Sequence, residues 1–185
     1  MRKLPLILTS AAALAAAGPA FAQSDTSTKE FSVIGTVPAL CFGGTLEGDD
    51  SVFDLGVLID TSTGYLRTDL SAPDKVLSGA FCSTRSTIEV TATAMTAQTF
   101  TATPPADFSR TVNYIATASG WTVAPAVYDT GSASNPQATQ TRATAFTGDI
   151  TVGLSDFSTG GGSDLRLVAD PSYLGAVTVT LTVVD

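Results

Sequence analysis

The sequence contains no histidine and only three glutamates (Glu30, Glu47 and Glu89). Without histidine, the chain lacks the most common general base, the usual partner of a nucleophilic serine or cysteine, and the most common zinc ligand. A pair of catalytic carboxylates of the glycosidase type would have to come mainly from aspartates, and their spacing suggests no such pair. We therefore expect neither catalysis nor a bound cofactor.

Basic residues are scarce, with 9 Lys and Arg against 17 Asp and Glu. Two of the basic residues, Arg2 and Lys3, lie in the first 22 residues, which contain no acidic residue. The remainder therefore has seven basic and 17 acidic residues, a net charge of −10. Nucleic acids and anionic membrane surfaces attract basic patches, so we expect neither as a partner.

Long apolar runs are also missing, except for one at the start, from Leu4 to Ala17. It follows Arg2 and Lys3 and precedes a helix breaker and small residues in Gly18–Ala22, which is the order of a cleavable secretory signal. The run is too short to span a bilayer stably, which takes about 20 residues. We predict a signal peptide at 1–22 and export to the periplasm, the cell surface or the medium, without membrane insertion after cleavage. The alternative is an uncleaved anchor.

The chain has two cysteines, Cys41 and Cys82, and both follow the predicted signal. An oxidising compartment offers them one intramolecular pairing, so we predict a disulfide, with two free buried thiols as the alternative. In the chain-entropy model a loop of this length stabilises the fold by about 4 kcal/mol.

The rest of the chain has the pattern of an all-β protein. Its hydrophobic content of 44% provides enough apolar surface for a core, which argues against disorder. No convincing helical period follows the signal, whereas short alternating segments separated by Gly and Pro recur every 8 to 12 residues or so. After a polar extension at 23–30, we predict one antiparallel immunoglobulin-like sandwich over 31–185. The expected strands lie at 31–41, 52–59, 76–82, 87–95, 112–115, 121–123, 126–128, 149–154, 165–168 and 176–184.

Two of these strands have a distinct face. In the first, Phe31, Val33, Val37 and Cys41 share one side of the pleat. In the last, Val177, Val179, Leu181 and Val183 face one way, whereas the threonines between them face the other. The last strand is therefore expected to have one wet face.

The order of several motifs resembles the chaperone-usher pilins and the related spore coat protein U family. The motifs are Gly35-x-Val37 leading to Cys41, Asp54-Leu55-Gly56, the run Leu77–Cys82 with the second cysteine, and the closing run Tyr173–Leu181. The resemblance covers most of the chain after the signal, with the middle matching only in general strand character. The resemblance implies a sandwich that lacks one strand, whose open groove accepts an extended segment from a neighbouring subunit.

The function that this resemblance implies is a secreted structural subunit of a pilus-like or surface-coat assembly. Its partners would be like subunits, with a periplasmic chaperone and an outer-membrane usher. The assembly residues would be Phe31, Val33 and Val37 in the first strand and Val177, Val179, Leu181 and Val183 in the last. However, residues 23–30 contain no large apolar residue to donate, and the chain ends without an aromatic residue. Both departures leave a self-complete sandwich open.

Other functions rest on single features. The acidic cluster Glu47, Asp49 and Asp50 offers oxygen ligands for calcium, although a solvated turn explains it better. Trp121, the only tryptophan, could stack on a sugar in a monomeric glycan-binding or surface-binding module, although burial between two sheets is the commoner fate.

Overall fold

The computed structural model of the chain describes residues 27–184. The predicted signal at 1–22 lies outside these residues. The chain divides into two units, with the boundary after Thr36. In the first unit, residues 27–36 form neither helix nor strand, and all ten are exposed. The second unit, from Val37 on, contains the core and the strands.

The second unit is built from strands, with a single 3₁₀ turn and no α-helix among its described residues. The secondary-structure elements are β1 (Cys41–Phe42), β2 (Thr45–Leu46), η1 (Glu47–Asp49), β3 (Lys75–Cys82), β4 (Ser86–Ala97), β5 (Phe108–Ser109), β6 (Thr111–Ser119), β7 (Ala126–Asp129), β8 (Thr139–Arg142), β9 (Phe146–Thr159), β10 (Arg166–Leu167) and β11 (Tyr173–Val183).

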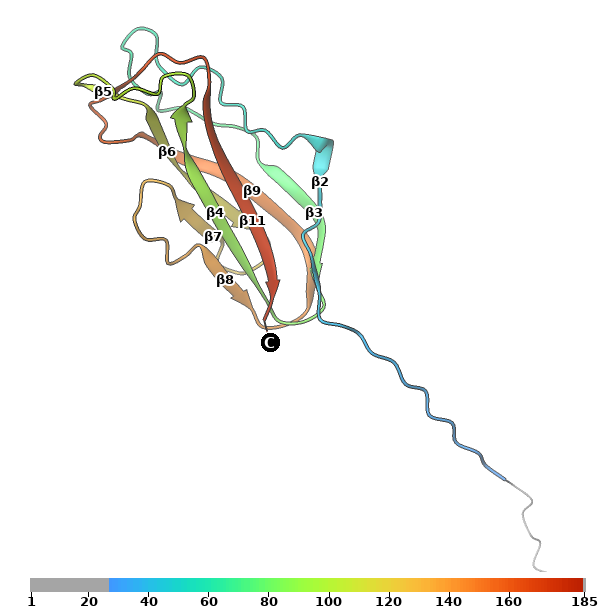
Figure 1. Cartoon of the computed structure of the whole chain (residues 1–185). Coiled ribbons are helices and arrows are strands. Elements are labelled where there is room, and N and C mark those ends of the chain that lie inside the picture. Colours follow the sequence, from blue (N-terminus) through green and yellow to red (C-terminus); the bar gives the residue numbers. More distant parts are fainter. Residues whose placement is uncertain (1–26, 185) are drawn as a thin grey trace, which may run out of the picture. The chain divides into compact units, whose positions relative to one another are not determined.

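The main sheet has the strand order β1-β3-β9-β6-β4-β11, with every pair antiparallel (Figure 1). β4 and β6 pair only at one end, through Met95–Val112 and Thr96–Thr111. Away from that end the two strands have different neighbours, because β4 pairs with β8 and β6 pairs with β7. The sheet therefore folds over itself into two layers, with β4 and β11 in front of β6 and β9 in the view of Figure 1.

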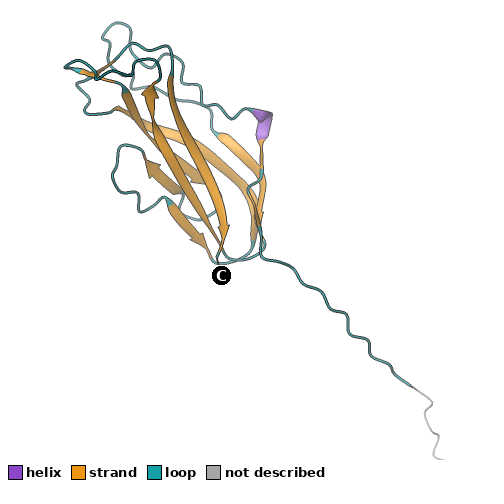
Figure 2. Cartoon of the chain, viewed as in Figure 1, coloured by secondary structure: helices purple, strands orange, loops and turns teal. Residues whose placement is uncertain are grey.

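The core fills the space between these layers. Alternate residues of β4, β6 and β9 point into it, and the cluster also includes Trp121 and Cys82. Tyr114 of β6 spans the layers, because its hydroxyl donates to the carbonyl oxygens of Thr93 and Ala176 at 2.8 and 3.0 Å. Burial raises the pKa of Tyr114 to about 12. The structure confirms the predicted all-β antiparallel sandwich with one disulfide (Figure 2).

The predicted first strand, residues 31–41, is wrong. Among residues 27–40 no strand forms. A strand is stabilised by a paired neighbour, and residues 31–37 have none among the described residues. Attachment to the sandwich begins only at Pro38 and Leu40, whose backbones bond to Ser83. Phe31, Val33 and Val37 are therefore not members of the sheet.

Two other predicted strands are also absent. Residues 52–59 form only an isolated bridge between Ile59 and Leu66. The Asp54 carboxylate accepts the Gly56 N–H at 2.8 Å, and Gly56 has a φ of 63°, so a tight turn interrupts the extended run. Residues 121–123 form a bend after Gly120, whose φ is 93°.

Candidate assembly site

β11 presents its apolar residues as predicted. Val177, Val179 and Leu181 are half-buried and pack against the core, and Val183 is also half-buried. The alternating threonines, Thr178, Thr180 and Thr182, are exposed. This alternation is what a strand at the boundary between core and solvent requires.

One edge of β11 has no partner strand within residues 27–184. β11 ends the strand order and pairs only with β4 among the described residues. The Val90 N–H donates to Ala138, on the side of β4 away from β11, and Val90 lies opposite Val179. In an antiparallel pair, the N–H and C=O of Val179 must then also point away from β4. The same holds at every second residue, so Val177, Leu181 and Val183 aim their backbone groups at this free edge.

β1 lies close to the free edge of β11 without pairing with it. The sheet is thus nearly closed, and the line along which β11 and β1 approach each other without pairing is called the seam. An unpaired edge with half-buried side chains is a template for another strand, because incoming backbone groups find donors and acceptors already aligned.

A cavity of about 800 Å³ lies at the Tyr173 end of β11. One wall is formed by residues 52–59 and the other by residues 167–174, with Met95 between them. Its lining is largely apolar and includes Phe53, Leu55 and Leu174. Tyr173 and Leu174, the first paired residues of β11, line the cavity, so a segment bound along the edge as far as this end would reach it.

Two electrostatic contacts fix the walls of this cavity. Lys75 donates to Asp50 at 2.7 Å and lies 5.6 Å from the centre of the Phe53 ring, which holds the start of the first wall. In the second wall, Asp170 accepts the backbone N–H groups of Thr99, Phe100 and Ser172 and the Thr99 hydroxyl, at 2.6 to 2.9 Å. Burial raises the pKa of Asp170, but these hydrogen bonds outweigh it and hold the pKa far below its usual range.

Asp170→Asn is expected to lower the melting temperature at neutral pH and to matter less in acid. The folded pKa of Asp170 lies below its unfolded value of about 3.9, so its stabilising contribution is complete above about pH 4 and declines as the pH falls. Melting curves followed by circular dichroism should show the two proteins converging below pH 4.

The matched control for this prediction is Asp164→Asn. Asp164 is exposed and makes no side-chain hydrogen bond in the described part of the chain, so its replacement should change stability little at any pH. A difference between wild type and Asp170→Asn that stayed constant with pH would show that the charge of Asp170 is not what stabilises the wall.

The segment before the sandwich is extended and apolar. Phe31 is 83% exposed, Val33 97% and Val37 85%. Pro38 and Leu40, just after this segment, are held to the sandwich, because the Ser83 N–H donates to the Leu40 carbonyl at 2.9 Å and the Ser83 hydroxyl donates to the Pro38 carbonyl at 3.2 Å. The chain therefore has an unpaired apolar segment, residues 31–37, that ends at a fixed attachment point.

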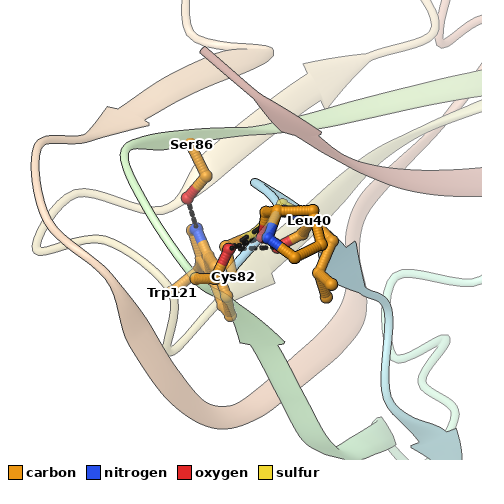
Figure 3. The surroundings of a disulfide bond; sticks show 7 residues. Leu40, Cys82, Ser86 and Trp121 are labelled. Carbon is orange, nitrogen blue, oxygen red and sulfur yellow. Dashed lines mark hydrogen bonds between the residues drawn. A yellow bond between two sulfur atoms is a disulfide. The ribbon is translucent and has the colours of Figure 1, made fainter. Parts of the chain in front are cut away.

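The predicted disulfide joins Cys41 of β1 to Cys82 of β3, and the two residues are also Cα partners in the sheet. Figure 3 shows this bond together with Leu40 and Trp121. The indole N–H of Trp121 donates to the Ser86 hydroxyl at 3.3 Å. The Trp121 side chain is 0% exposed, so it is not available to stack on a sugar.

The remaining sequence-based sites receive no support. Among residues 27–184 no group of three or more potential ligand side chains could hold a metal ion, and Asp50 of the acidic cluster is paired with Lys75. No helix in the described part of the chain has the length and hydrophobicity to cross a membrane. Comparisons with protein-family models, curated proteins and solved structures give no match.

Proposed function

We propose that this chain is an exported structural subunit of a pilus-like or surface-coat assembly. In the proposal, residues 31–37 of one copy add a strand to the free edge of β11 in the next. The observation that carries it is the coexistence, in one chain, of an unpaired strand edge and an unpaired apolar segment. The segment would supply backbone hydrogen-bond partners to β11, and the neighbouring sandwich would cover the apolar side chains of the segment.

The two partners match in length and period. Phe31, Val33, Gly35 and Val37 occupy four positions on one side of an extended segment, and β11 offers four apolar residues at the same spacing of two. A seven-residue strand spans about 20 Å between its end residues. Because the backbone groups of Val177, Val179, Leu181 and Val183 face the free edge, each could form a hydrogen-bonded pair with one of the four residues in the segment.

The free energy that the segment gains by burying its side chains is comparable to the cost of association. Burying a large apolar side chain contributes about 1.5–3 kcal/mol, so Phe31, Val33 and Val37 together contribute about 5–9 kcal/mol. Loss of translational and rotational freedom on association costs about 4–15 kcal/mol. The side chains of the segment alone are therefore marginal, and the ladder along β11 and the further burial of its valines must provide the rest.

The other partners follow from the resemblance to pilins. An exported subunit with an open strand edge needs cover before it reaches its assembly, since such edges promote aggregation. In the proposal a periplasmic chaperone supplies that cover, and an outer-membrane usher exchanges it for the next subunit.

Val33→Asp is expected to abolish association of the exported, purified chain. The substitution would place a carboxylate in the apolar seam, and burial of an unpaired charge is strongly unfavourable. Because Val33 is 97% exposed in the free chain, the change should leave the melting temperature of the isolated subunit unaltered. Sedimentation velocity over a range of concentrations measures the association.

Ser32→Asp is the matched control, because it adds the same charge at the adjacent residue, which points to the other side of an extended segment. It should associate as wild type does. The proposal fails if wild type remains monomeric at every concentration, or if Val33→Asp associates as strongly as Ser32→Asp.

A further inference from the structure

A pair of aromatic rings lies on the outer surface next to the disulfide. Phe42 and Phe81 are Cα partners in β1 and β3, with ring centroids 5.9 Å apart. They are 47% and 37% exposed, because their neighbours Cys41 and Cys82 take the inward positions of the pleat. Leu40, two residues before Phe42, is also exposed. These three residues are called the aromatic patch.

The aromatic patch is tied to the segment that the proposed function assigns to another copy. Phe42 lies five positions after Val37, a distance of at most about 18 Å along a fully extended chain. Ser83 fixes Pro38 and Leu40 within this stretch. Wherever residues 31–37 bind, the aromatic patch must therefore lie next to the molecule that binds them.

The direction of binding decides which part of that molecule the patch meets. Every pair in the main sheet is antiparallel, and antiparallel pairing is slightly more stable per residue than parallel pairing. If Phe31 pairs with Val183 in this direction, then Val37 pairs with Val177. The chain then leaves at the Tyr173 end of β11, and Leu40 falls beside Leu174.

The surface at the Tyr173 end of β11, where the bound segment would leave the strand, is apolar. Leu174 is exposed and lines the 800 Å³ cavity, together with residues 52–59. At the opposite end of β11, the Val184 N–H bonds to the carbonyl of Arg85, beside a charged side chain. The cavity lining offers an exposed aromatic pair a larger apolar surface to bury than the single side chain of Arg85 does.

We propose that the aromatic patch of one copy packs against the mouth of this cavity in the next copy, as a second contact beside the added strand. The inference rests on the proposed function and adds to it the direction of the strand and the surface at the junction. It gives the cavity an occupant, namely Leu40, Phe42 and Phe81 of a second copy of this chain.

The direction is tested by cross-linking two singly substituted proteins after mixing. Leu40→Cys in one and Leu174→Cys in the other should form a heterodimer with a bismaleimide of about 10 Å. Leu40→Cys with Thr182→Cys, which lies at the far end of β11, should not. Cross-linking of the second pair instead of the first, or of neither pair in a sample that associates, overturns the inference.

The contact itself is tested by the double substitution Phe42→Ser and Phe81→Ser. It should weaken association about tenfold or more, and because the two rings are only 47% and 37% exposed, the melting temperature is measured as well, to separate a lost contact from lost folding. The double substitution to tyrosine keeps the ring area and should associate as wild type does. Association of the serine protein at wild-type strength, while Val33→Asp abolishes it, overturns the junction but not the proposed function. A wild type that never associates overturns both.

Discussion

Replacing Cys41 and Cys82 together with alanine is expected to lower the free energy of unfolding by about 4 kcal/mol. The two residues are 41 positions apart, and the cross-link limits the unfolded chain by the entropy of closing a loop of that length. The loss is a large part of the total stability of a domain, which is about 5–15 kcal/mol. Urea unfolding followed by circular dichroism provides the measurement.

The same experiment distinguishes the cross-link from the residues that form it. Reduced wild type should lose a similar amount of stability, whereas Ser83→Ala, which removes the hydroxyl contacts to Pro38 and Leu40, should lose only about 1 kcal/mol. A cysteine-free protein within about 1 kcal/mol of wild type would show that the sandwich does not depend on this bond.

Trp121→Ala is expected to cost about 3–5 kcal/mol, the range for removing a large aromatic side chain from a core. The Trp121 side chain is fully buried and stands edge-on to Phe146, with ring centroids 5.2 Å apart and an interplanar angle of 87°. Its N–H also donates to the buried hydroxyl of Ser86, which would lose its partner. Chemical denaturation of the purified chain gives the free energy.

Trp121→Phe separates the ring from its hydrogen bond. Phenylalanine retains most of the aromatic volume and should recover more than half of the loss, while leaving Ser86 without the indole donor. If alanine and phenylalanine were equally destabilising, the hydrogen bond rather than packing would be the main contribution of Trp121.

Much of the sandwich could be predicted from the sequence, because local patterns report on burial. The alternation from Val177 to Val183 predicts a strand with one wet face, and the structure has it. A single cysteine pair that follows a predicted secretory signal predicts its own disulfide. In both cases the deciding interaction is local, or has only one possible partner.

The absence of a strand at 31–40 could not be predicted, because alternation does not show whether a neighbouring strand is available for pairing. Phe31, Val33 and Val37 have the spacing of a strand, but no edge within the described chain pairs with them. The interruption at Gly56 was missed for a different reason. It depends on the Asp54 side chain bonding to the backbone, which competes with an apolar pattern that looks continuous.

The cavity could not be predicted from the sequence. Asp170 bonds to Thr99 and Phe100, about 70 positions away, and nothing near Asp170 in the sequence indicates those partners. The aromatic patch also depends on long-range register, because Phe42 and Phe81 meet only when Cys41 and Cys82 are aligned. The sequence nevertheless contains one local indication of the aromatic patch, because an aromatic residue lies directly beside each cysteine.

The free edge of β11 has a consequence for the thermodynamics of the whole chain. A ligand that binds only the folded form raises its stability by mass action, by about 2.7 kcal/mol when present at 100 times its dissociation constant. If the ligand is another copy of the same chain, the melting temperature depends on the protein concentration and rises with it. Dilution would then weaken the fold of each subunit as well as the assembly.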